Sequence, residues 1–299
     1  MAPVTLGLSH LSNPLATPDQ LSQSASQLAG VPRDLEESTR YRTSSIIQAV
    51  GILLRLPQQT IAETIVIFCR FWIGSKGGSL LDHSAKDIAA AALYLVTKPG
   101  PYPLSPKQIL NALYYVIHAS EHDVQKSYAS EHEVIPLYTE GQIEIDRAAL
   151  LRSESHILQV LGFQLHVALP HALCINYLQT LGVLTAESGH ELTRRAYAHL
   201  NSSLLNPQLI YLTHQPCDLA AAAIYLGARE TEVNLPDEPW WEVFDVDRED
   251  LGFLVVAMTS MAGFAEDQEI KARIAPPPLT SKEVRDEIGT VIPRNGDHP

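Results

Sequence analysis

The 299-residue chain has only three cysteines, no Lys/Arg run and no long apolar run. Cys69, Cys174 and Cys217 lie far apart, which excludes a disulfide framework and a cysteine-based zinc site. No apolar run approaches the roughly 18 residues that a membrane helix needs, and the N-terminus lacks the pattern of a secretory signal. The net charge of −13 opposes binding to a nucleic-acid backbone. We therefore expect a soluble, reduced, intracellular protein that binds neither membrane nor nucleic acid directly.

Signals of catalysis are also missing. There is no nucleophile-elbow glycine pattern, and no Gly-rich phosphate loop follows a strand. A repeated Ser-Glu-His places His122 and His132 beside acidic residues, but the two histidines lack the i,i+4 spacing of a helical metal site, so a solvated loop is the better interpretation. We predict no catalytic residues, no metal and no cofactor, and hence a protein that is not an enzyme.

What the chain has in abundance is helix signals. Thr17 and Ser105 each open a capping box, with Pro at the next position and Gln three residues after the cap. Amphipathic segments with apolar residues at three-and-four spacing follow, whereas the alternation typical of strands is scarce. The sequence predicts an all-α fold.

One helical segment occurs twice. The first copy, from Asp87 to Lys98, reads DIAAAALYLVTK, and the second, from Asp218 to Arg229, reads DLAAAAIYLGAR, 131 residues later. This spacing is too long for a solenoid repeat and suits a duplicated domain. Four consecutive alanines let neighbouring helices approach closely, so each copy is expected at the centre of its own bundle. Chance similarity between two Ala-rich helices is the alternative.

These features predict four regions. Residues 1–40 form a polar N-terminal arm, residues 41–168 a first helical box and residues 169–265 a second. The mixed-charge, proline-containing residues 266–299 form a flexible, exposed tail.

Glu154 is a charged residue within a predicted apolar helix face. It lies four residues after Leu150 and three before Ile157, in an apolar stripe that also includes Leu151, Leu158 and Leu161. A buried carboxylate needs a partner, because burying an unpaired charge costs several kcal/mol. Lys98, at the end of the first Ala-rich helix, is a candidate. Two interpretations stay open: an ordinary salt bridge within the chain, or two charges that face another protein.

At this point the residues resemble a known family. Two helical boxes, LYLVTK at the end of the third helix and RSESHILQVLGFQL as the fifth are similar to cyclins. AVGILLRLPQQTIAETIVIFCRFW and LGFQLHVALPHALCINYLQTL are most similar to the transcription and splicing branch, the L-type above all, with the K- and T-types as relatives. The resemblance implies a two-box cyclin fold over about residues 40–264.

It also implies a function. A cyclin binds and activates a cyclin-dependent serine/threonine kinase, here one acting in RNA polymerase II transcription or pre-mRNA splicing, as a nuclear 1:1 heterodimer. In the family, residues at the positions of Lys98 and Glu154 contact the kinase, and those at the positions of Leu158 and Phe163 pack against its C-helix.

Three departures from the family pattern qualify that expectation. Pro-Gly-Pro follows Lys98 where cyclins commonly carry carboxylates, the substrate-docking motif of cell-cycle cyclins is absent, and no Arg/Ser-rich tail is present. The alternatives are a cyclin-like scaffold that binds no kinase, and a general transcription factor similar to transcription factor IIB. The acidic balance and the absence of an N-terminal zinc ribbon disfavour the latter.

Overall fold

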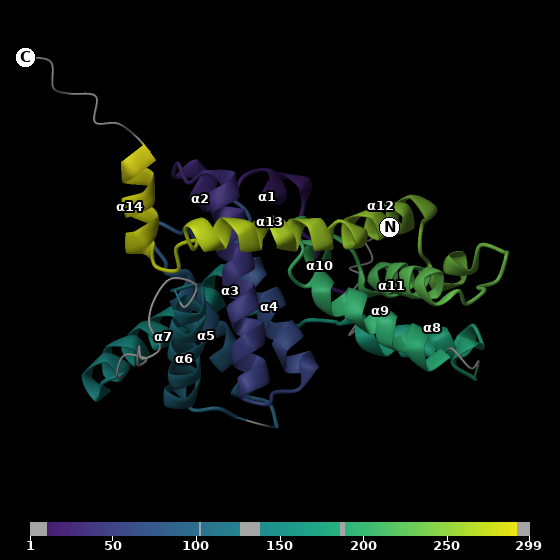
Figure 1. Ribbon diagram of the computed structural model, residues 1–299, viewed down its shortest axis with the longest axis horizontal. Helices are drawn as coiled ribbons and strands as arrows, with labels where there is room; N and C mark the ends of the chain where they lie inside the picture. Colours follow the sequence, from purple (N-terminus) through teal and green to yellow (C-terminus); the bar gives the residue numbers. More distant parts are fainter. Residues whose placement is uncertain (1–10, 102, 126–137, 186–188, 292–299) are drawn as a thin grey trace, which may run out of the picture. The chain divides into compact units, whose positions relative to one another are not determined.

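The computed structural model describes residues 11–101, 103–125, 138–185 and 189–291, without the side chains of 120–125 and 290–291 (Figure 1). Within these ranges the chain is helical and has no strand, so the predicted all-α class is confirmed. The chain divides into two compact units, with divisions after residues 17, 165 and 267. We call residues 18–165 with 268–299 the N-box unit, and residues 1–17 with 166–267 the C-box unit. No helix in the described ranges is long and apolar enough to cross a membrane.

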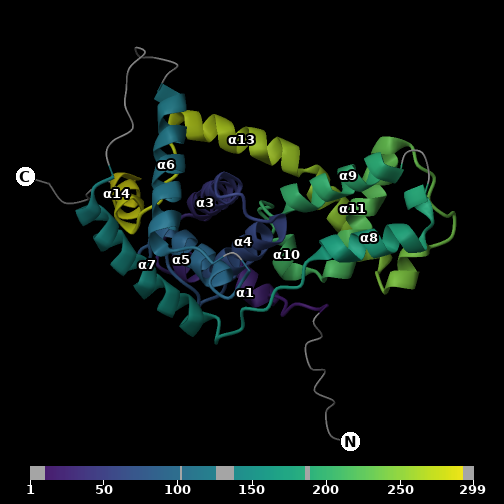
Figure 2. The ribbon, with the colours of Figure 1, turned by 90° about the horizontal axis from the view of Figure 1, so that it is seen from below.

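The N-box is built around the first Ala-rich helix, α5. The four alanines Ala89–Ala92 are buried, and α5 contacts each of the other four main helices of the box (Figures 1 and 2). Because an alanine face has almost no side-chain bulk, several helices can lie close to it at once. The main helices are α3 (Arg33–Leu53), α4 (Gln58–Trp72), α5 (Ala85–Thr97), α6 (Pro106–Gln125) and α7 (Glu140–Val160).

The C-box repeats this plan around the second Ala-rich helix, α11. Ala220–Ala223 are fully buried, and α11 contacts α8, α9 and α12 (Figure 1). The helices of this part of the chain are α8 (Pro170–Thr180), η1 (Val183–Thr185), α9 (Gly189–Ser203), α10 (Ile210–Thr213), α11 (Pro216–Thr231), η2 (Trp240–Phe244), α12 (Arg248–Thr259) and α13 (Met261–Ile274). The last of these crosses the division between the units.

The two Ala-rich helices correspond in detail. Each has a basic residue near its C-terminal end that lies over a tyrosine one turn earlier: Lys98 Nζ is 5.2 Å from the Tyr94 ring centroid, and the Arg229 guanidinium carbon is 5.9 Å from that of Tyr225. Cation–π contacts of this kind stabilise both helix ends. The same spacing of 131 residues relates both pairs, so the sequence repeat is also a structural one.

The helix starts correspond as well. Asp87 and Asp218 occupy the first turns, and desolvation by burial raises the pKa of both carboxyls. Asp218 completes a capping box by accepting from the Gln215 backbone N–H at 2.9 Å. In each box, therefore, an acid at the N-terminal end and a base at the C-terminal end agree with the helix dipole.

The boundary predicted at residue 40 lies inside a helix. Helix α3 already begins at Arg33, and Glu36 within it is buried, accepting a hydrogen bond from Ser24 Oγ at 2.8 Å. Residues 33–40 therefore belong to the N-box. Before them stand two short helices, α1 (Pro18–Ser22) and α2 (Ala25–Leu28), in the same unit. Asn13 belongs to the C-box unit, where its side chain pairs with the backbone of Ala168 at 2.8 Å in both directions.

The expectation of a flexible tail from residue 266 is wrong for residues 266–291. Helix α13 continues to Ile274, and a further helix, α14 (Ser281–Val291), follows. Leu279, just before α14, and Val284 within it are buried in the N-box unit, and the burial of these apolar side chains offsets the cost of ordering a charged segment. Charge and prolines alone do not reveal these two buried positions.

Candidate protein-interaction site on the N-box

Lys98 terminates α5. Its backbone N–H still donates to Tyr94 O at 2.9 Å, and Pro99 then prevents the helix from continuing. The side chain is 56% exposed, and its ammonium lies against the Tyr94 ring. The helix end thus presents a cation together with backbone carbonyls that lack an intrahelical partner.

Glu154 lies on α7, and its partner is Lys98. The two charged groups approach to 3.1 Å between Nζ and Oε1, and this hydrogen bond raises the pKa of the Lys98 ammonium. Only 13% of the Glu154 side chain is exposed, compared with more than half of that of Lys98. The pair joins α5 to α7 at the surface, and its open side is the lysine.

The apolar residues of α7 that were predicted to form one stripe lie on two different faces of the helix. Leu150 and Ile157 are fully buried, whereas Leu151 is 40% exposed and Leu158 is half-buried. Residues seven apart lie on nearly the same face, and neighbouring residues are about 100° apart around the helix. The first two therefore face α5, and the second two face outward. Glu154 falls between the stripes, where its stem is covered and its carboxylate reaches the rim.

Phe163 is held out from the end of α7. Gly162 and Phe163 both adopt left-handed backbone conformations, with φ of 56° and 62°, and Phe163 N donates to Leu158 O at 2.9 Å. For a residue with a side chain this conformation costs about 1 kcal/mol or more. The Phe163 side chain is nevertheless 71% exposed. Strain combined with an exposed aromatic ring is typical of a site that serves binding.

The structure thus places all four predicted residues on one end of α5 and α7 or directly after it. Lys98 and Glu154 touch, and Leu158 bonds to Phe163 through the backbone. Sequence reasoning missed Leu151 and Val160 as exposed apolar residues of the same region. Splitting the stripe by angle around the helix would have found them.

The corner after Lys98 departs from the pattern that the resemblance implies. Gly100 N donates to Thr97 O at 3.1 Å, which forms a tight turn directly after the helix. Pro99 is exposed, and no carboxylate stands at this turn. Around the lysine, Glu154 therefore supplies the neighbouring negative charge.

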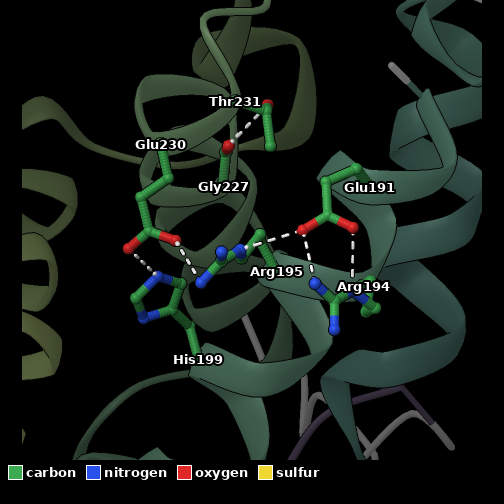
Figure 3. A network of polar contacts seen from close by, with 7 residues as sticks. All are labelled: Glu191, Arg194, Arg195, His199, Gly227, Glu230 and Thr231. Atoms are coloured by element: carbon green, nitrogen blue, oxygen red, sulfur yellow. Dashed lines mark hydrogen bonds and ion pairs between the residues drawn. The ribbon is translucent and has the colours of Figure 1, made fainter. Parts of the chain in front are cut away.

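The equivalent corner of the C-box has different surroundings. Glu230, the residue after Arg229, pairs with His199 at 2.8 Å and with Arg195 at 3.9 Å, two contacts that are drawn as dashed lines in Figure 3. Arg195 and its neighbour Arg194 in turn bind Glu191 at 3.1 and 2.7 Å. This surface is a chain of ion pairs between α9 and α11, whereas the N-box corner borders exposed apolar side chains.

Two helical boxes, each built around an Ala-rich helix, together with a Lys–Glu pair beside an apolar rim, define a protein with a two-box cyclin-like fold. In sequence, the chain is 31% identical over 231 residues to Cyclin-L2 from Mus musculus, which is 77% of this chain and 41% of that protein. Cyclin-L1-1 from Arabidopsis thaliana is 32% identical over 231 residues, 77% of this chain and 51% of the relative. The predicted resemblance to L-type cyclins is confirmed.

The fold is also similar to that of a solved structure. A chain in the crystal structure of the yeast RNA Pol II CTD kinase CTDK-1 complex superposes with a TM-score of 0.64 at 12% identity, covering 97% of this chain and 86% of that one. This likeness concerns the fold, and it confirms the predicted two-box architecture. The chain spans about half or less of the length of the curated relatives named above. No protein-family model matches it.

Proposed function

We propose that the chain is a cyclin: the regulatory subunit that binds and activates a cyclin-dependent serine/threonine kinase, and not itself an enzyme. The carrying observation is the N-box corner, where a charged pair borders exposed and half-buried apolar side chains. Lys98, Glu154, Leu158 and Phe163 are the residues that contact the kinase in this proposal. The two-box fold and the similarity to proteins named Cyclin-L support it.

The proposed mechanism is one of docking. The C-helix of a kinase lies against Leu158 and Phe163, and its position decides whether its glutamate pairs with the catalytic lysine of the kinase. Phosphoryl transfer requires that pair. By binding only the inward position of the C-helix, the cyclin shifts the kinase population to the active state and performs no chemistry.

Docking of a kinase at Lys98 and Glu154 would leave neither of these two charges without a partner. Lys98 uses one of its three ammonium donors on Glu154, and more than half of its side chain is open to solvent. The remaining donors are available to backbone carbonyls of the kinase. Because the pair is already formed, docking does not have to assemble it, which lowers the entropy cost of binding.

We further propose that the kinase acts in RNA polymerase II transcription or pre-mRNA splicing, in the nucleus, and that the complex is a 1:1 heterodimer. The support is the name of the relatives and the fold neighbour from a complex described as an RNA Pol II CTD kinase.

Affinity purification of the tagged chain from its own cells tests the proposal. We expect one protein kinase to co-purify in equimolar amount, and the complex to phosphorylate a peptide from the RNA polymerase II tail. A matched purification of a Lys98→Ala, Glu154→Gln double variant should lose the kinase. Recovery of the intact chain without any kinase would instead favour the kinase-independent scaffold.

A further inference from the structure

The segment of residues 276–288, which we call the strap, lies on the N-box although it follows the C-box in sequence. Pro277, Pro278 and Leu279 are buried, and the α14 residue Val284 is buried with them. The strap contacts the N-box far from Lys98. Its partners Ser84 and Lys86 are at the N-terminal end of α5, a helix of about 20 Å at 1.5 Å per residue, whose other end carries the lysine.

The N-box holds the strap by three bonds to the strap's main chain and one from its Arg285 side chain. The Arg42 guanidinium donates to Pro277 O, and Lys86 N in the first turn of α5 donates to Leu279 O at 3.1 Å. Ser281 N donates to Ser84 Oγ at 3.3 Å, and the Arg285 side chain donates to Leu81 O. Donors that bind backbone carbonyls, here an arginine and a helix N-terminus, recognise an extended main chain. In such sites, apolar pockets recognise single side chains.

The strap is also suited to bind as a separate ligand. Its prolines favour an extended conformation and lose little entropy on binding. The start of α14 carries its own cap, because Glu283 Oε2 accepts from Leu279 N at 2.8 Å and from Thr280 N at 3.2 Å. Both partners of this cap lie within the strap itself.

The strap fills its groove incompletely. A cavity of about 580 Å³ remains between the strap and the side chains of α6 and α7, with Leu110, Leu113 and Ile117 on its apolar side. This space is partly open to solvent, and its volume is within the range of ligand sites. The groove is therefore wider than the segment that lies in it.

We propose that the strap is a tethered ligand, which closes in cis a groove that takes a proline-rich, extended segment of a partner protein when the strap leaves. The tether adds a high local concentration to these contacts, which makes the strap a strong competitor for the groove. Since the groove and the Lys98 corner are at opposite ends of α5, a partner in the groove and a protein at the corner can bind together.

The test uses the full chain. A protease site is placed at the exposed Ala275, the folded protein is cleaved, and the strap is removed by dilution and gel filtration. The probe is a fluorescent peptide of residues 276–291. We expect it to bind the cleaved protein, and to bind the uncleaved protein at least about tenfold more weakly. A peptide with Leu279→Ala and Val284→Ala should fail, and one with Lys282→Ala at an exposed position should bind normally.

A second peptide tests the partner chemistry. A peptide with Pro-Pro-Leu in a proline-rich sequence and no α14 residues should compete with the probe, and should do so more weakly on an Arg42→Ala variant. Three results would overturn the proposal: a cleaved protein that unfolds once the strap is gone, a folded cleaved protein that does not bind the probe, or a proline-rich peptide that never competes. Unfolding would make the strap an integral part of the N-box.

Discussion

Lys98 and Glu154 bind each other across 3.1 Å, and the two residues differ sharply in exposure. The glutamate is the covered member of the pair, and the lysine is the open one. Both interpretations that the sequence left open therefore apply to this pair. It is a salt bridge within the chain, and it places a charged group at the surface of a candidate interface. Its role in binding is separable from any role in folding, because the exposed lysine stays solvated when its partner is removed.

We predict that Glu154→Gln keeps the N-box folded and weakens kinase binding about tenfold or more. The amide has the shape of the carboxylate but no charge, so Lys98 loses its anchor and the docking surface loses its only negative group at that corner of the described chain. Titration calorimetry with the co-purified kinase measures the affinity.

Glu144→Gln is the matched control for that variant. Glu144 is on the same helix, is exposed and pairs with Arg147 at 3.2 Å, away from the corner. Its replacement should leave kinase affinity unchanged. Equal losses for both variants would mean that overall charge, and not the Lys98 corner, governs binding.

Phe163→Gly should separate stability from binding. Glycine accepts the left-handed conformation that costs Phe163 about 1 kcal/mol, and little burial is lost with the exposed ring. We expect the midpoint of thermal unfolding to stay the same or rise, while kinase affinity falls about tenfold or more through loss of an aromatic anchor.

The control for the aromatic variant is Val243→Ala, which removes another strongly exposed apolar side chain from the C-box. Neither stability nor kinase affinity should change. A Phe163→Gly protein that melts earlier and binds normally would show that the ring supports the fold.

The two duplicated bases should differ in effect. Lys98→Ala is expected to weaken kinase binding as Glu154→Gln does, whereas Arg229→Ala should change it less than twofold. Arg229 lies over Tyr225, and the carboxylate beside it, Glu230, already pairs with His199 and Arg195 of α9 (Figure 3). Side-by-side pull-downs against the same kinase measure the difference. A larger loss for Arg229→Ala would place the docking face on the C-box.

Gly227→Val should destabilise the C-box by about 1–3 kcal/mol. A Cβ at this position of α11 would lie 3.1 Å from backbone atoms of Ala196 and Leu192 on α9, so the two helices would have to separate. The corresponding residue of α5 is Val96. Chemical denaturation followed by circular dichroism measures the loss.

Gly252→Ala on α12 should instead stabilise the C-box. An added Cβ there meets no atom within 4 Å, so the higher helix propensity of alanine should stabilise the protein by up to about 1 kcal/mol. Equal destabilisation by both variants would show that helix crossing does not limit position 227.

The correct predictions of the fold rest on patterns among residues that are close in sequence. The helical class follows from three-and-four spacing and caps, and the duplication from the repeated Ala-rich segment, because both depend on residues close in sequence. The predictions that went wrong needed distant partners. Leu150 and Leu151 look alike in the chain, but one is sealed against α5 and the other is on the outer face of α7. The charges and prolines of residues 266–299 predict a flexible tail, whereas the burial of Leu279 and Val284 depends on N-box residues that are distant in sequence.

By itself, the sequence determined that this protein is built of helices, that it contains one unit twice, and that Glu154 needs a positive partner. Only the tertiary structure decided that the partner is Lys98, that Phe163 is held outward on a strained backbone, and that residues 276–288 return to the first box. The physical reason is that periodicity and capping are set within one or two helical turns. The pairing of a charge and the covering of an apolar face depend on which helices pack together.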